Sequence, residues 1–230
     1  YRFADIDIET EAGAGFTATG DGTLIVTSAN GTNSIATTTG RVLNLSGMSI
    51  GTGGANFDTV DATGVAISAD NPDANAITLQ NLDGTGQLRI GSGEDPGDGG
   101  TLVSNGNADD PAFFVNNVDN LVVNNVTIDN SAATGAGLVV TGQDGGTATF
   151  NGLNAETSGN AIAVNVNGNE GGTITFNNLV AESVNGSAVV VDNNEGATIN
   201  FAQDLTVTAT GTGQGFIASI AAGRRSRWLW

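Results

Sequence analysis

The chain has 230 residues, of which 24 are acidic and six are basic, and its formal net charge is −18. It contains no lysine, histidine or cysteine, which excludes zinc sites built on histidine and cysteine, Ser-His-Asp and Cys-His catalysis, Schiff-base lysines and disulfides. So acidic a chain lacks the basic surface that nucleic-acid binding requires, and it has no apolar run long enough to predict a membrane span.

Short apolar runs, bounded by glycine, asparagine and aspartate, recur along the whole chain. These bounding residues favour turns over helix interiors, and the runs are rich in β-branched residues. Segments with a helical apolar period are interrupted everywhere by glycine or asparagine, so we predict an all-β fold. In chain order the clearest runs are residues 3–8, 24–26, 45–50, 79–82, 121–128, 138–140, 145–150, 171–176, 189–191 and 196–201.

The second half of the chain contains a repeat of about 26 residues. Its clearest copies are GGTATF at 145–150, GGTITF at 171–176 and GATINF at 196–201. The last position of each block is a phenylalanine, and the spacing between these phenylalanines is nearly constant. In the same frame we place Phe3, Leu45, Leu79 and Val123. The wider intervals on either side of Leu79 predict longer loops or one extra, degenerate turn.

A repeat of this length predicts a coil in which each repeat forms one turn and neighbouring turns complete the core. Parallel pairing at about 4.8 Å per turn then gives roughly nine turns and a rod of about 40 Å. Equivalent side chains stack into columns. We expect a core ladder at Phe150, Phe176, Phe201, Leu153 and Leu179, and a corner amide ladder at Asn124, Asn151 and Asn177.

The coil length, the pattern GG-T-x-T-F-N-N-L and the Asn/Gly corners resemble the right-handed parallel β-helix of bacterial surface and adhesin-like proteins. Pectin-lyase-like enzymes share this superfold. The resemblance is strongest over residues 112–216 and looser over 1–111. It implies a right-handed parallel β-helix (β-solenoid) and an extracellular or cell-surface location, and it brings no catalytic motif with it.

Residues 1–223 are expected to form the single coil domain, and residues 224–230 a cationic aromatic tail. Arginine and tryptophan are enriched at binding hot spots, and an open coil exposes unpaired strands at both ends. We expect the tail to dock on an acidic neighbour, with an intramolecular cap as the alternative, while Tyr1, Arg2 and Phe3 help to seal the opposite end. The tail residues concerned are Arg224, Arg225, Arg227, Trp228 and Trp230.

Two groups of carboxylates are candidates for calcium, the only cofactor that the sequence suggests. The first is the loop containing Glu94, Asp95 and Asp98. The second is a column of acids at equal offsets in the repeat: Asp129, Glu156, Glu182 and Glu9. Solvated surface acids that keep the rod soluble are the alternative interpretation of both groups.

Catalysis on acidic glycans is the activity to consider for this superfold. Lyases with the fold use an arginine or lysine base beside acidic calcium ligands, whereas the repeat places no acidic cluster beside Arg41 or Arg89. An acidic chain also repels an anionic glycan. We predict that the protein is not an enzyme and has no catalytic residues. Aligned threonines at 147, 149, 173 and 175 are either ordinary exposed strand residues or a flat array like that of ice-binding proteins.

The sequence therefore predicts a structural role: a subunit or module of an extracellular bacterial filament, surface layer or adhesin that assembles through its ends. The expected partners are copies of the chain itself in a head-to-tail homopolymer, with no nucleic acid and no membrane span. A carbohydrate-binding or polysaccharide-cleaving β-helix, with a glycan partner, is the first alternative. A passenger fragment of a larger secreted adhesin is the second.

Overall fold

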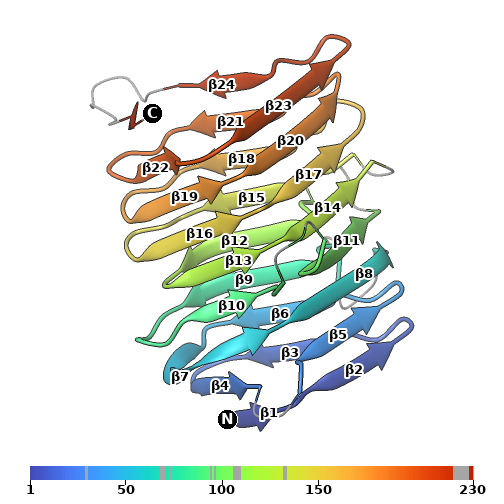
Figure 1. The fold of residues 1–230 in the computed structure, drawn as a ribbon, viewed down its shortest axis with the longest axis vertical. Coiled ribbons are helices and arrows are strands. Elements are labelled where there is room, and N and C mark those ends of the chain that lie inside the picture. Colours follow the sequence, from blue (N-terminus) through green and yellow to red (C-terminus); the bar gives the residue numbers. More distant parts are fainter. Residues whose placement is uncertain are drawn as a thin grey trace.

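Three parallel β-sheets stack into a β-solenoid (Figure 1). The computed structural model describes residues 1–28, 31–67, 71–72, 74–93, 95, 97–105, 110–131 and 134–219, together with the backbone of 228–229. In these residues every element is a strand and none is a helix, which confirms the all-β prediction. We name the sheets A, B and C in the order in which the chain visits them.

The strands of each sheet pair with the strands of the turns before and after them. Sheet A has nine strands: β1 (Arg2–Ala4), β4 (Thr23–Thr27), β7 (Ser49–Phe57), β10 (Leu88–Ile90), β13 (Leu121–Asn124), β16 (Thr147–Asn151), β19 (Thr173–Asn177), β22 (Thr198–Phe201) and β25 (Trp228–Leu229). Sheet B has eight: β2 (Asp7–Thr10), β5 (Ser34–Thr37), β8 (Thr59–Val65), β11 (Gly100–Ser104), β14 (Val126–Asn130), β17 (Asn154–Thr157), β20 (Leu179–Val184) and β23 (Leu205–Thr210). Sheet C also has eight: β3 (Phe16–Thr19), β6 (Leu43–Ser46), β9 (Ile77–Leu82), β12 (Phe113–Val118), β15 (Leu138–Thr141), β18 (Val164–Asn167), β21 (Val189–Asp192) and β24 (Phe216–Ala218).

The coil makes about eight turns of about 26 residues, close to the roughly nine expected. The difference arises because two turns are longer than the repeat predicts. These are the turn from Phe57 to Ile90 and the turn from Ile90 to Val123, whose end residues pair in successive strands of sheet A. Most of the additional residues lie in corners, so the strands of sheet A keep their register, while the pairing of β8 with β11 in sheet B contains one register shift.

The frame proposed for the first half of the chain is partly wrong. Val123 does lie in the sheet A column that contains Phe150, since these two residues pair. Phe3 does not, because it pairs with Val26, and that column continues through Ala55, Leu88 and Leu121 to Ala148. Leu45 and Leu79 instead pair with each other in sheet C. Strands of all three sheets share the same alternation of apolar and polar residues. The sequence pattern therefore cannot tell whether two similar segments belong to the same sheet or to different sheets of the coil.

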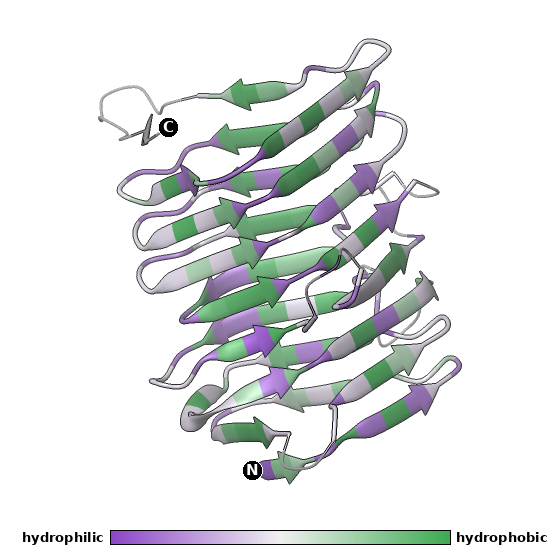
Figure 2. Cartoon of the chain, in the orientation of Figure 1, coloured by the Kyte–Doolittle hydropathy of each residue, from purple (hydrophilic) through white to green (hydrophobic). Residues whose placement is uncertain are grey.

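Apolar side chains of all three sheets fill the interior of the coil, and polar ones alternate with them along the strands (Figure 2). Of the expected core residues, Phe150, Phe176, Leu153 and Leu179 are buried, and Phe201 is partly buried against them. The rings of Phe150 and Phe176 stack with centroids 5.0 Å apart, and those of Phe176 and Phe201 with centroids 5.4 Å apart. Leu153 and Leu179 are buried one residue before the paired Asn154 and Val180.

Amide side chains bond along the stack at two corners. At the corner between sheets A and B, Asn151 Nδ2 donates to Asn124 Oδ1 at 2.8 Å, and Asn177 Nδ2 donates to Asn151 Oδ1 at 2.7 Å. The residue that follows each ladder position has a positive φ, at Asn125, Gly152 and Asn178. The left-handed turn and the amide ladder thus occur together, as asparagine and glycine permit.

A second amide ladder, at the corner between sheets C and A, is fully interior. It consists of Gln143, Asn169 and Asn194, all buried. Asn169 Oδ1 accepts from the Gln143 backbone N–H at 3.0 Å, and Asn169 Nδ2 donates to Asn194 Oδ1 at 2.7 Å. This ladder was not predicted from the sequence, although each member directly precedes one of the acid-glycine pairs Asp144-Gly, Glu170-Gly and Glu195-Gly.

Candidate functional site

The two ends of the coil are the first candidate site, because all three sheets end there in strands with one free edge. β1, β2 and β3 form the first turn, and β23, β24 and β25 are the outermost strands at the other end (Figure 1). Each of these strands pairs on one side only among the described strands. A free parallel edge is a template for another strand.

The N-terminal end also opens the apolar core to solvent. Tyr1 is 76% exposed and Phe3 is 40% exposed, while Phe16 beneath them is buried. Tyr1, Phe3, Phe16 and Met48 contribute to the lining of a hollow of about 480 Å³. Arg2, the third residue predicted at this end, is exposed and pairs with Ile25. The structure therefore brings Tyr1 and Phe3 together at this end.

The hydrogen bonds of β2 identify the backbone groups that face away from the coil. Ile6 O accepts from Ser34 N at 2.8 Å, and Thr10 O accepts from Thr38 N at 3.1 Å. In a parallel ladder alternate residues point their N–H and C=O to opposite sides. Asp7 and Glu9 therefore direct their backbone groups toward the free edge.

The opposite end has the complementary arrangement in β23. Asp204 O accepts from Leu179 N, and Thr210 O accepts from Asn185 N, both at 2.9 Å. The same alternation directs the backbone groups of Leu205, Val207 and Ala209 outward. The side chains of Leu205, Val207, Phe201 and Phe216 are only partly buried against the core.

The C-terminal tail adds one strand at this end. Trp228 pairs with Ile199 and Leu229 with Asn200, so β25 extends sheet A beyond β22. Arg224, Arg225, Arg227 and Trp230 lie outside the described residues. Their assembly role stays a prediction.

Acidic residues are concentrated on one face of the coil. The strands of sheet B carry six carboxylates, at Asp7, Glu9, Asp61, Asp129, Glu156 and Glu182. The strands of sheet A carry none, and those of sheet C carry only Asp192. The coil therefore has one strongly acidic face and two nearly uncharged ones.

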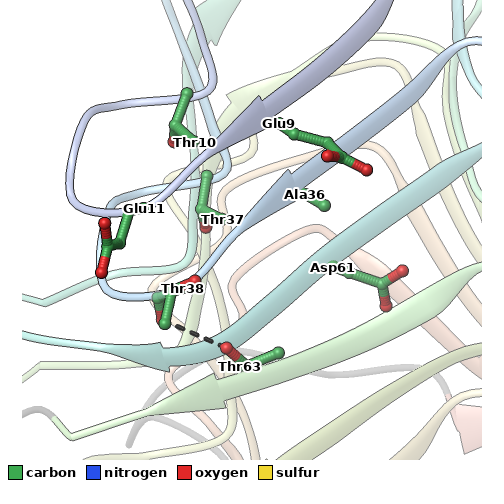
Figure 3. Close-up of a pocket in the computed structure, with 8 residues that line it drawn as sticks. All are labelled: Glu9, Thr10, Glu11, Ala36, Thr37, Thr38, Asp61 and Thr63. Carbon is green, nitrogen blue, oxygen red and sulfur yellow. Dashed lines mark hydrogen bonds between the residues drawn. The ribbon is translucent and has the colours of Figure 1, made fainter.

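A hollow of about 380 Å³ lies on the acidic face near the N-terminal end. Glu9 and Asp61 point outward on either side of the small Ala36 (Figure 3). Glu11 lines the hollow from the turn that follows β2, and Thr63 Oγ1 donates to Thr38 O at 3.4 Å beneath it. The carboxylates are held apart by the strand that carries Ala36.

The acidic column of the repeat has three of its four proposed members. Asp129 pairs with Glu156, and Glu156 pairs with Glu182. The placement of Glu9 in this column is wrong, because Glu9 pairs with Ala36, which in turn pairs with Asp61. Glu9 was assigned by its offset from Phe3, and Phe3 itself lies two positions out of the repeat frame because the pairing of β4 with β7 changes register.

The calcium prediction for the loop at 94–98 rests on residues that the structure describes only in part. Glu94 lies outside the described residues. Asp98 Oδ2 accepts from the Asp95 backbone N–H at 3.1 Å, so this carboxylate serves the loop itself. In the described part of the chain no group of three or more acidic, histidine or cysteine residues is placed to hold a metal ion. Calcium binding stays a prediction.

A third acidic group lies at the corner between sheets C and A. Asp83, Asp119 and Asp144 come from three successive turns and line a hollow of about 290 Å³. Partial burial raises the pKa of Asp119 above its ordinary value, and the negative charges of Asp144 and Asp83 raise this pKa further. This corner therefore retains a proton more readily than an isolated aspartate does.

The outer face of sheet A carries the aligned threonines. Thr147 pairs with Thr173, which pairs with Thr198, and Thr149 pairs with Thr175. The second row continues into Asn200 rather than into another threonine. Arg89 lies on the same sheet, paired with Asn56 and Val122.

Comparison of the chain with protein-family models, with curated proteins and with solved structures finds no match. In the part of the chain that the structure describes, no helix has the length and apolar character needed to cross a membrane.

Proposed function

We propose that the protein is a structural module that assembles head to tail through the ends of its coil, as a subunit of an extracellular fibre or surface layer. The observation that carries this proposal is that, among the described strands, all three sheets end at both ends in a free parallel edge, over a core that is only partly covered. Such ends favour joining, because a second copy satisfies the free backbone groups and buries the exposed apolar side chains.

The topology makes the two ends compatible in direction and order. When one copy follows another along the axis, β2 continues sheet B beyond β23 and β3 continues sheet C beyond β24. β1 then takes the place beyond β22 that β25 occupies in the single copy, so β25 is displaced on joining. All pairings remain parallel, as they are inside the coil. Contacts between unlike ends do not close on themselves, so they build a filament rather than a dimer.

The charges of the sequence favour this polarity. The first strand of sheet B carries Asp7 and Glu9, whereas β23 and β24 carry no charged residue. Arg224, Arg225 and Arg227 directly precede β25 in the sequence. A head-to-tail contact brings opposite charges to one interface, and a contact between two N-terminal ends brings together acids of like sign.

The variant Glu9→Pro tests the proposal at the free edge of β2. Proline removes a backbone N–H that faces away from the coil, and it is tolerated on an edge strand. We expect this variant to raise the critical concentration for filament formation at least about tenfold. Sedimentation velocity and negative-stain electron microscopy measure this concentration.

The matched control is Glu9→Ala, which removes the same carboxylate and keeps the N–H. It loses one of the two acids of β2 but keeps the free edge, so it is expected to assemble much more readily than Glu9→Pro, and circular dichroism checks that both variants remain β-structured. Deletion of residues 224–230 measures the contribution of the tail separately. The proposal is overturned if the wild type remains monomeric at every accessible concentration, or if Glu9→Pro assembles as readily as Glu9→Ala.

A further inference from the structure

The outer face of sheet C carries a column of apolar side chains over five adjacent strands. We call this column, with the one polar residue in it, the sheet C stripe. Its members are paired in register from β12 to β24: Phe114, Val139, Asn165, Val190 and Ile217. With a strand spacing of about 4.8 Å the stripe is about 19 Å long.

The stripe is distinct from the core. The residues that precede its members in the strands, such as Phe113, Leu138 and Val189, are fully buried. The stripe residues point outward by the alternation of the strand and are only partly buried. A hollow of about 620 Å³ adjoins Val139 and Asn165. The stripe residues are not part of the buried core cluster that fills the coil.

The middle of the stripe is polar and incompletely bonded. The Oδ1 atom of Asn165 is buried and accepts no hydrogen bond among the described residues. A buried amide oxygen without a donor is unfavourable. A second amide placed against Asn165 offers such a donor after rotation of the side chain.

Charge indicates which partner fits this face. Asp192 is the only charged residue on the described strands of sheet C, so these strands offer a charged ligand little to bind. A glycan site needs several directed polar groups, which an apolar stripe does not supply. The chain itself, whose net charge is −18, carries six carboxylates on the strands of sheet B. Two copies therefore approach each other with little repulsion when their sheet C faces meet.

We infer that the sheet C stripe binds the sheet C stripe of a second copy. The contact is isologous, with the same residues contributed by both copies. A stripe about 19 Å long and one side chain wide covers less area than the roughly 800 Å² per partner that a stable dimer buries. Pairing is therefore weak for single copies, and where copies are joined end to end, which rests on the proposed function, the repeated contacts strengthen it.

Asn165 is the position that reports on this pairing. It is the third of the five members, so it meets its own counterpart whether the two rods run parallel or antiparallel. The chain contains no cysteine, so the single variant Asn165→Cys forms a disulfide only with another copy. The control is Thr175→Cys, on the outer face of sheet A. A disulfide requires Cα atoms within about 7 Å, which makes the reaction specific for close approach.

We expect Asn165→Cys to form disulfide-linked dimers at least about tenfold faster than Thr175→Cys under mild oxidation. Addition of Val190→Lys to Asn165→Cys is expected to slow the reaction to the rate of the control, because the added charge is desolvated in the contact. The inference is overturned if Asn165→Cys and Thr175→Cys react equally fast, or if Val190→Lys leaves the rate unchanged.

The same pair of cysteine variants, made in the Glu9→Pro background, separates this inference from the proposed function. A preference for Asn165→Cys that persists without filaments supports the sheet C contact, even if assembly through the ends fails. Filaments that form without any preference for Asn165→Cys overturn the sheet C contact and leave the head-to-tail assembly standing.

Discussion

Individual polar residues are as important as apolar ones inside this coil, and the buried amide ladder shows why. Asn169 donates to Asn194 Oδ1 and to Val140 O, and its Oδ1 accepts from the Gln143 backbone. Each bond connects one turn to another. A buried polar group that loses its partner retains the full penalty of desolvation, so these amides act as obligatory links between turns.

Replacement of Asn169 by alanine leaves the Gln143 N–H and the Val140 carbonyl without their side-chain partner. We expect Asn169→Ala to lower the free energy of unfolding by about 3 kcal/mol. Asn151→Ala in the half-buried corner ladder is the control and is expected to lower it by about 1 kcal/mol, because water reaches the groups that it releases. Urea denaturation followed by circular dichroism gives the free energy of unfolding of both variants. Equal losses for the two would contradict the distinction between the interior ladder and the half-buried corner ladder.

Asp119 makes the stability of the coil dependent on pH. Its pKa in the folded chain lies above the ordinary value of 3.8 because of partial burial and the nearby Asp144 and Asp83. The folded state therefore binds this proton more tightly than the unfolded state does. Stability from this group is present below pH 3.8 and is lost as the pH rises through the raised pKa.

The side chain of the variant Asp119→Asn cannot ionise, so this variant avoids the loss of folding stability that ionised Asp119 causes at neutral pH. We expect its melting temperature at pH 7 to exceed that of the wild type by a small amount, about 1–2 °C, since solvent screens the charges. The difference is expected to disappear near pH 3, where the wild-type carboxyl is protonated. Asp21→Asn, at an exposed turn, is the control. A lower melting temperature for Asp119→Asn at pH 7 would refute this account.

At the scale of elements, the strands are held by columns of identical side chains. The rings of Phe150, Phe176 and Phe201 lie at 13° to one another in successive strands of sheet A. The register therefore places each ring directly over the next, at a separation near the strand spacing. The middle of this column and its outer end differ, since Phe176 is buried and Phe201 is only partly covered.

That difference predicts unequal effects of the same substitution. Phe176→Ala leaves a cavity between two rings and is expected to lower the free energy of unfolding by about 3–5 kcal/mol. Phe201→Ala removes a ring that is already partly in water, and is expected to lower it by about 1–2 kcal/mol. Chemical denaturation of the monomeric chain measures both losses. A loss for Phe201→Ala as large as that for Phe176→Ala would show that the last turn is covered.

The sequence was sufficient to predict the stacking of elements wherever the corners repeat. Over residues 112–216 the corners of each turn have similar lengths, so the constant spacing of the repeat aligns equivalent strands. In the first half the spacing of equivalent strands varies and the pairing of β4 with β7 changes register, so Leu45, Phe3 and Glu9 were assigned to the wrong columns. Buried amides such as Gln143 were missed because they have the same residue types as exposed turns. The outward direction of the Glu9 backbone depends on register, which only the structure supplies.

At the scale of the whole molecule, the three faces differ in chemistry although the coil repeats one fold. Sheet B is acidic, the outer face of sheet A carries threonine and asparagine, and sheet C carries the apolar stripe. In the described part of the chain the outermost strands leave a free edge at each end of the axis. The proposed contacts along the axis and across it therefore use different surfaces, so each can be tested by substitution without disturbing the other.

The two long turns of the coil, from Phe57 to Ile90 and from Ile90 to Val123, keep their sheet A strands in register with those of the shorter turns. Their additional residues lie between β8 and β9, between β10 and β11 and between β11 and β12. Since stacking rather than corner length aligns the strands, a corner accepts extra chain without displacing the turns beyond it. The coil is thus a natural scaffold for display: a foreign peptide grafted into one of these corners would recur about every 40 Å along an assembled fibre.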